Sequence, residues 1–209
     1  MEKIEKSKML MLLKQVVNNK KYKWFDSGVP YNLNIIGIRS SSKIIDTFDD
    51  MITVSYFDGV EWQCQQFYAT VDAGVFYYLH PMNVEGTASV TESQHLSTFG
   101  IGLHKNEYRC LIQIKEIEVK RVVYKQGLFI TGRTETGFYG IHIHRASSIV
   151  EMNTVGRYSA GCQVIQNFND FDLFMSIIDK SVEQGFKPVF TYTLINEQDI
   201  EDAKQQVGI

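Results

Sequence analysis

The spacing of apolar side chains divides the chain into a helical start, a β-rich middle and a mixed end. In residues 4–19 the apolar side chains recur at helical spacing, which predicts an amphipathic helix. Residues 22–30 have no such pattern and are predicted to be a linker. From residue 33 onward, apolar and polar positions alternate in short runs, as is typical of strands.

The middle of the chain predicts a series of strands. We expect them at residues 33–39, 51–57, 61–71, 109–124, 128–132 and 138–144. Asp58-Gly59 and Gln126-Gly127 supply the turns that would join neighbouring strands into hairpins. Residues 72–107 hold several glycines and little periodicity, so we expect loops and short strands there.

The last third changes character. Apolar side chains at helical spacing predict a second helix that begins near Asn169 and ends at Gly185. A strand is expected over 187–195, and Asn196 can cap a final short helix. The pattern as a whole indicates a mostly β protein of the α+β class.

Composition and charge narrow the class of protein. The 209 residues, 44% hydrophobic and 22% charged, suit one well-cored domain, which we place at 31–209 after an N-terminal segment at 1–30. A net charge of −3 gives no electrostatic basis for nucleic-acid binding. No run approaches the roughly 18 apolar residues of a membrane span.

The N-terminal segment, residues 1–30, leads to two further expectations. It lacks the apolar run and cleavage site of a secretory signal, which predicts synthesis in a cytoplasm. We expect its helix, residues 4–19, to pack on the main domain. The same apolar face could instead support self-association or docking on a protein partner.

The richest chemistry lies between Gly140 and Ile165. His142 and His144 share one face of a predicted strand, because residues two apart in a strand point the same way. Cys162 follows in a Ser-Ala-Gly-Cys turn whose small residues would let backbone N–H groups approach a substrate carbonyl. A neighbouring imidazole and such N–H donors are the groups that activate a nucleophilic cysteine.

The same residues allow two other interpretations. Cys162 can be a small buried residue, with both histidines satisfied inside the sheet. Alternatively His142, His144 and Cys162 can hold zinc, although no carboxylate close in sequence completes the site. We expect neither a metal nor another cofactor, and we expect Cys64 and Cys110 to be buried strand residues.

The order of these residues resembles the catalytic domain of the L,D-transpeptidases, cysteine enzymes that cross-link or trim peptidoglycan stem peptides. The matching residues are His144 or His142, Gly156, Ser159, Gly161 and Cys162. The block IHRA…VGRYSAGCQVI is most similar to divergent members encoded by bacteriophages and prophages. The resemblance implies a β-sandwich with a helix after the cysteine, here 170–184. It also implies action at the bacterial cell wall after release by a phage route, or a place in the virion.

The resemblance assigns roles to individual residues. Cys162 would be the nucleophile and His144, favoured over His142, the general base, with Ser159 and Gly161 completing the catalytic turn. The substrate, a peptidoglycan stem peptide, would be lined by His142, Tyr139, Arg157, Gln163 and Arg39. Arg157 or Arg39 would bind its carboxylate.

Two departures from the family pattern support other functions. Ala160 stands where the family turn usually has a histidine, and Gln163-Val164 stand where an arginine is common. A virion-associated binding or structural protein that keeps the fold without turnover is therefore the alternative, and a zinc hydrolase is the third hypothesis.

Overall fold

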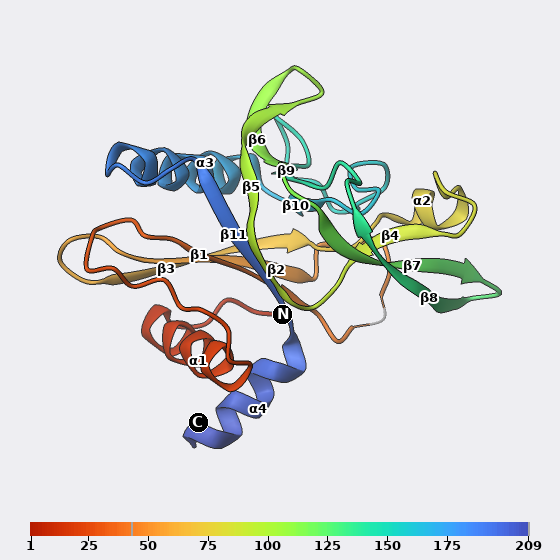
Figure 1. Cartoon of the computed structure of the whole chain (residues 1–209). Coiled ribbons are helices and arrows are strands. Elements are labelled where there is room, and N and C mark those ends of the chain that lie inside the picture. Colours follow the sequence, from red (N-terminus) through yellow and green to blue (C-terminus); the bar gives the residue numbers. More distant parts are fainter. Residues whose placement is uncertain (43, 209) are drawn as a thin grey trace.

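The computed structural model describes residues 1–42 and 44–208 and shows a curled sheet with helices on both of its faces (Figure 1). The helices are α1 (Lys6–Asn19), α2 (Val75–Leu79), α3 (Phe168–Glu183) and α4 (Glu197–Val207). The strands are β1 (Asn34–Arg39), β2 (Asp50–Phe57), β3 (Trp62–Thr70), β4 (Thr87–Val90), β5 (Gln94–His104), β6 (Tyr108–Gln113), β7 (Ile117–Lys125), β8 (Leu128–Gly137), β9 (His142–Arg145), β10 (Gln163–Ile165) and β11 (Val189–Asn196).

Eight of the strands close into a barrel in the order β1-β11-β5-β6-β9-β10-β3-β2. The β1–β11 and β9–β10 pairs are parallel, whereas the other pairs in the ring are antiparallel. A separate antiparallel sheet, β4-β7-β8, lies beside the barrel (Figure 1). The mostly β, α+β class is confirmed, and the strands form a closed barrel where we expected a sandwich.

Helices cover both faces of the sheet around β1, which explains its unbroken apolar sequence. Ile35 belongs to the core cluster that includes α3, whereas Ile36 and Ile38 belong to the cluster that includes α1 and α4. A strand that is covered on both sides has no solvent-facing positions and therefore loses the alternation of an exposed sheet.

Side-chain caps determine where the last two helices begin. The Asn167 side chain accepts hydrogen bonds from the N–H groups of Asn169 and Asp170, so α3 begins at Phe168, one residue before the predicted start. Asn196 and Asp199 form a reciprocal capping box at the start of α4, which confirms the predicted cap.

Two of the strand predictions are wrong, each for its own reason. Residues 109–124 form two strands, β6 in the barrel and β7 in the small sheet, because alternation continues while the chain changes sheets. The glycine-rich region 72–107, predicted to hold loops and short strands, contains β5, an 11-residue barrel strand. Its Gly100 and Gly102 lie beneath the Ile114 and Ile112 side chains, where a Cβ would come within 3.0 and 2.4 Å.

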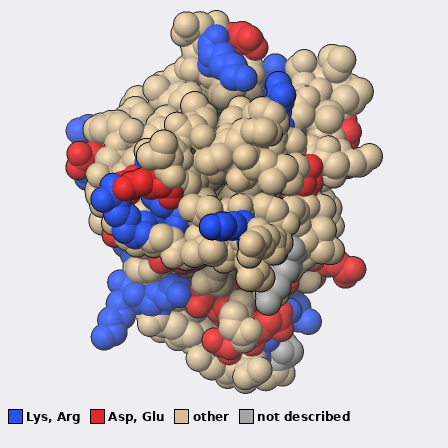
Figure 2. Space-filling model, turned by 90° about the vertical axis from the view of Figure 1, so that its right-hand side faces the viewer, with Lys and Arg blue, Asp and Glu red and all other residues tan. Residues whose placement is uncertain are grey.

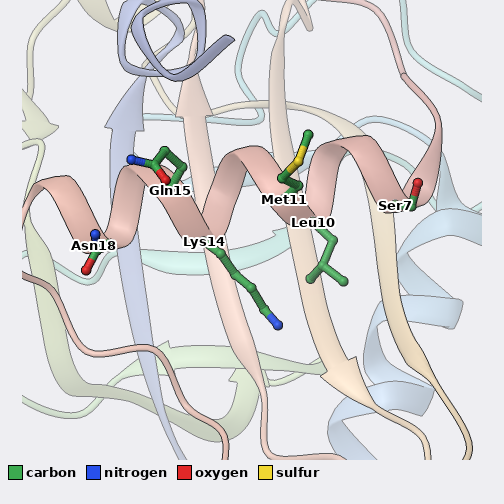
Figure 3. A pocket seen from close by; sticks show the side chains of 6 residues that line it. All are labelled: Ser7, Leu10, Met11, Lys14, Gln15 and Asn18. Carbon is green, nitrogen blue, oxygen red and sulfur yellow. The ribbon is translucent and has the colours of Figure 1, made fainter. Parts of the chain in front are cut away.

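Helix α1 packs on the barrel through one face. Leu12 and Leu13 are fully buried beside strand residues of β1 and β2, and Gln15 and Asn19 are hydrogen-bonded to Gln206 near the end of α4. A more exposed face of the helix, which includes Gln15, lines an open hollow of about 430 Å³ (Figure 3). There the Lys14 ammonium lies 4.2 Å from the centre of the Trp62 ring, so part of this face is used within the chain.

Across residues 1–42 and 44–208, the structure has no helix with both the length and the apolar character needed to cross a membrane.

Candidate functional site

The short parallel pair β9–β10 brings the histidine strand and the cysteine turn together. Gln163 pairs with Ile143, and Val164 pairs with His144. Cys162 directly precedes this ladder and lies beside His142, whose backbone N–H donates to Cys162 Sγ at 3.4 Å. Two segments about twenty residues apart in sequence therefore meet through the strand register.

The turn before β10 is held in place by Ser159 and by a close backbone approach. Ser159 Oγ donates to the Cys162 carbonyl at 2.8 Å and accepts the Gly161 N–H at 3.1 Å. Gly161 has a φ of +125°, and a Cβ there would lie 2.4 Å from the Ala88 carbonyl oxygen of β4. Ser159 is fully buried, so it positions Cys162 from behind the turn.

His144 is held in one tautomer. Its Nδ1 lies 2.8 Å from the Arg145 carbonyl, and because a carbonyl only accepts, Nδ1 carries the proton. The Tyr108 hydroxyl also donates to this carbonyl, at 3.3 Å. Within the described residues the other nitrogen, Nε2, is buried without a hydrogen-bond partner. An unsatisfied buried nitrogen of this kind calls for an explanation.

His142 turns toward a different set of residues on the same sheet face. Its Nδ1 lies 3.1 Å from His104 Nδ1 and 4.0 Å from Cys110 Sγ. The His104 ring in turn stacks on His144, with ring centres 4.1 Å apart. These side chains come from β5, β6 and β9, which are neighbours in the barrel.

Burial keeps the resting site neutral. It lowers the pKa of His144 to about 3, and the nearby His104 adds to the shift. Burial also raises the pKa of the Cys162 thiol to about 11, against the opposing effects of the His142 N–H and Lys105. At neutral pH the structure therefore holds a thiol and an uncharged imidazole rather than an ion pair.

Cys162 borders a pocket of about 340 Å³ between the barrel and the small sheet. The other lining residues are Tyr77, Met82, Asn83, Gly86, Thr87, Ala88, Arg121, Tyr139, Gly140, Ile141 and Ala160. Figure 2 shows the side of the molecule with the small sheet, where charges of both signs are scattered and much of the upper half is uncharged. Arg121 supplies a cation to the pocket, and its Nε donates to Glu135 at 2.5 Å.

Three residues expected at the substrate lie elsewhere. Gln163 is fully buried, and its amide oxygen accepts the Tyr192 hydroxyl at 2.7 Å, so it serves the core. Arg39 is held by Asp72 and Glu92 and lines another pocket. The exposed Arg157 guanidinium lies over the Phe76 ring at 3.9 Å. Tyr139 does line the pocket beside Cys162.

Tyr108, Cys110 and Arg121 were not predicted to belong to this region, and His104 was predicted to be a loop residue that could line the groove. Within residues 1–42 and 44–208, the ligand atoms that cluster belong to His104, Cys110 and His142, a different set from the His142, His144 and Cys162 of the zinc hypothesis. The alternation of β6 already placed Tyr108 and Cys110 on one strand face. Only the pairing of β6 with β9 shows that this face meets the histidines.

No protein-family model, curated protein or solved structure matches this chain. Functional inference therefore depends on the motif and on the geometry just described.

Proposed function

We propose that this chain is a cysteine acyltransferase or peptidase of L,D-transpeptidase type that acts on peptidoglycan stem peptides. The observation that carries the proposal is the state of His144, whose Nδ1 proton is bound by the Arg145 carbonyl and whose buried Nε2 has no partner in the described chain. An imidazole oriented by a third group is one part of the arrangement that activates a nucleophilic cysteine. Cys162 directly precedes β10, and β10 pairs with the strand that carries His144.

In the proposed reaction, Cys162 Sγ gives its proton to His144 Nε2 and bonds to the carbonyl carbon that precedes a D-amino acid. The Gly161 N–H is already bound by Ser159, so we assign the oxyanion to the N–H of Cys162. The C–N bond then breaks, and His144 returns the proton to the departing amine. The thioester passes to an amine, which cross-links, or to water, which trims.

The neutral resting state is compatible with this chemistry. Burial disfavours the thiolate and the imidazolium when each is considered alone. Transfer of one proton creates both charges together, so each offsets part of the desolvation of the other. The His142 N–H on Cys162 Sγ also stabilises the thiolate.

The pocket beside Cys162 fits the end of a peptide. Its volume of about 340 Å³ lies within the usual range of ligand sites. We assign the substrate carboxylate to Arg121, in place of Arg39 and Arg157, because only Arg121 of these three lines the pocket. Tyr139, whose ring lies 5.2 Å from the Arg121 guanidinium, would form one wall.

The proposal includes the fold type and the setting. Residues 31–209 would be an L,D-transpeptidase-like domain in which α3 is the helix that follows the nucleophile. The chain would reach the cell wall by a phage route of release, or act from the virion.

A virion-associated protein without turnover is the second candidate. The observation that favours it is the burial that raises the Cys162 thiol pKa to about 11, together with Ala160 in the turn. On this hypothesis the pocket would bind stem peptide or protein without forming a thioester.

Intact-mass spectrometry after incubation with a stem tetrapeptide, or with a carbapenem, separates the two candidates. We expect one covalent adduct on the wild type and on the buried-cysteine control Cys64→Ser, and none on Cys162→Ala. The His144→Gln variant should be acylated about 10²- to 10⁴-fold more slowly, a larger loss than for His142→Gln. Equal behaviour of the wild type and Cys162→Ala would exclude the acyl-enzyme mechanism.

A further inference from the structure

Three potential metal ligands outside the proposed catalytic pair lie at coordination spacing. The ligand atoms of His104, Cys110 and His142 all lie within 4.8 Å of one another. The two Nδ1 atoms are 3.1 Å apart, and Cys110 Sγ is 4.0 Å from His142 Nδ1. From zinc bond lengths, a tetrahedral site places two nitrogens roughly 3.3 Å apart and nitrogen and sulfur about 3.6 Å apart.

We propose that His104, Cys110 and His142 bind a zinc-class divalent cation through two imidazole nitrogens and one thiolate. Magnesium and calcium prefer oxygen ligands, whereas this nitrogen and sulfur set suits a borderline-soft tetrahedral ion. Three protein ligands leave the fourth position for water or an added ligand. Cys110 is fully buried and the two histidines are half-buried, so the ion would approach from the histidine side.

The two histidines face each other in a way that metal binding would explain. At 3.1 Å, one Nδ1 must donate and the other accept, which forces opposite tautomers on the two rings. A bound cation would accept the lone pairs of both.

The sheet supplies a rigid frame for the three ligands. Gly102 of β5 pairs with Cys110 of β6, and Ile112 of β6 pairs with His142 of β9, so the ligands project from three adjacent strands. On binding, the Sγ–H bond of Cys110 breaks, an Sγ–metal bond forms, and one proton is released to solvent.

The site uses neither Cys162 nor His144 as a ligand, so the test can separate it from the acyl-transfer proposal, although His142 contacts Cys162 through its backbone N–H. The test uses the full chain, stripped with a chelator and then titrated with zinc in competition with a chromophoric chelator. Cobalt in place of zinc adds a spectroscopic signature, since a thiolate ligand gives a charge-transfer band in the near ultraviolet. The variants are Cys110→Ser and His104→Gln, with Cys64→Ser and Cys162→Ser as controls.

We expect one equivalent of zinc on the wild type and a thiolate–cobalt band that Cys110→Ser abolishes and both controls keep. The half-buried His104→Gln, which is less prone to misfold than a change at Cys110, should weaken binding by at least the roughly 10- to 100-fold that loss of an outer-shell partner costs. Absence of stoichiometric binding to the wild type would overturn the proposal. So would a cobalt band that disappears with Cys162→Ser but persists in Cys110→Ser.

Discussion

Replacing Gly161 with alanine should destabilise the protein more than the same change at Gly140. Both glycines have positive φ angles, +125° and +67°. A Cβ at Gly140 would meet nothing within 4 Å, whereas one at Gly161 would lie 2.4 Å from the Ala88 carbonyl oxygen. Both variants therefore carry a backbone penalty, and only Gly161→Ala adds a steric clash.

The structure sets the magnitude of each effect. A left-handed alanine at Gly140 costs about 1–2 kcal/mol. At Gly161 a backbone cost of about 1–3 kcal/mol adds to about 1–3 kcal/mol for overpacking against a main-chain atom, giving about 2–6 kcal/mol. The Ala88 carbonyl must move by roughly 1 Å to restore an ordinary contact.

Urea denaturation of both variants, followed by far-ultraviolet circular dichroism, measures the two losses. The free energy of unfolding of Gly161→Ala should fall about 1–4 kcal/mol further than that of Gly140→Ala, with an unchanged dependence on urea. Equal losses would refute the reasoning, because they would mean that β4 does not constrain the cysteine turn.

Two further predictions concern buried polar groups. Burial, with the neighbouring Asp72, raises the pKa of Asp50 to about 7, so the folded state binds a proton that the unfolded state releases at lower pH. The stability that this group contributes is present below about pH 4 and is lost as the pH rises toward 7. The unfolding free energy of the wild type minus that of Asp50→Asn should decrease over this range, and a constant difference in urea melts would contradict it. Gln163→Leu should cost about 1–3 kcal/mol by leaving the Tyr192 hydroxyl unpaired, and adding Tyr192→Phe should recover part of this in the same assay; an additive double variant would count against the bond.

Local sequence signals predicted those elements whose structure depends on their own side-chain spacing or turn residues. The α1 helix, the hairpin at Asp58-Gly59 and the cap at Asn196 follow from side-chain spacing and turn chemistry, and the structure confirms them. The failures lie where tertiary context decides. The sequence of β5 resembles a loop because it contains glycines, which are needed there to leave space for isoleucine side chains of a neighbouring segment. Closure of the barrel depends on long-range pairing, which no local pattern encodes.

The candidate site likewise has residues that the sequence predicts and contacts that only the tertiary structure reveals. His142, His144 and Cys162 could be predicted because they lie on two short segments joined by a recognisable spacing. The tautomer of His144 depends on the Arg145 carbonyl, and the second cluster depends on His104 and on strand pairing. Gln163 looked like a substrate residue because it follows Cys162. The alternation of the short strand β10, however, turns its side chain into the core.

The barrel closes through its two shortest strands, and this has a mechanical consequence. β9 has four residues and β10 three, so few backbone hydrogen bonds join the halves of the ring at the point where Cys162 lies. Such a seam should be the first part of the ring to open, and its amides the first to exchange with deuterated solvent. A ligand in the neighbouring pocket would hold β9 and β10 together. Its binding should therefore stabilise the closed barrel as a whole.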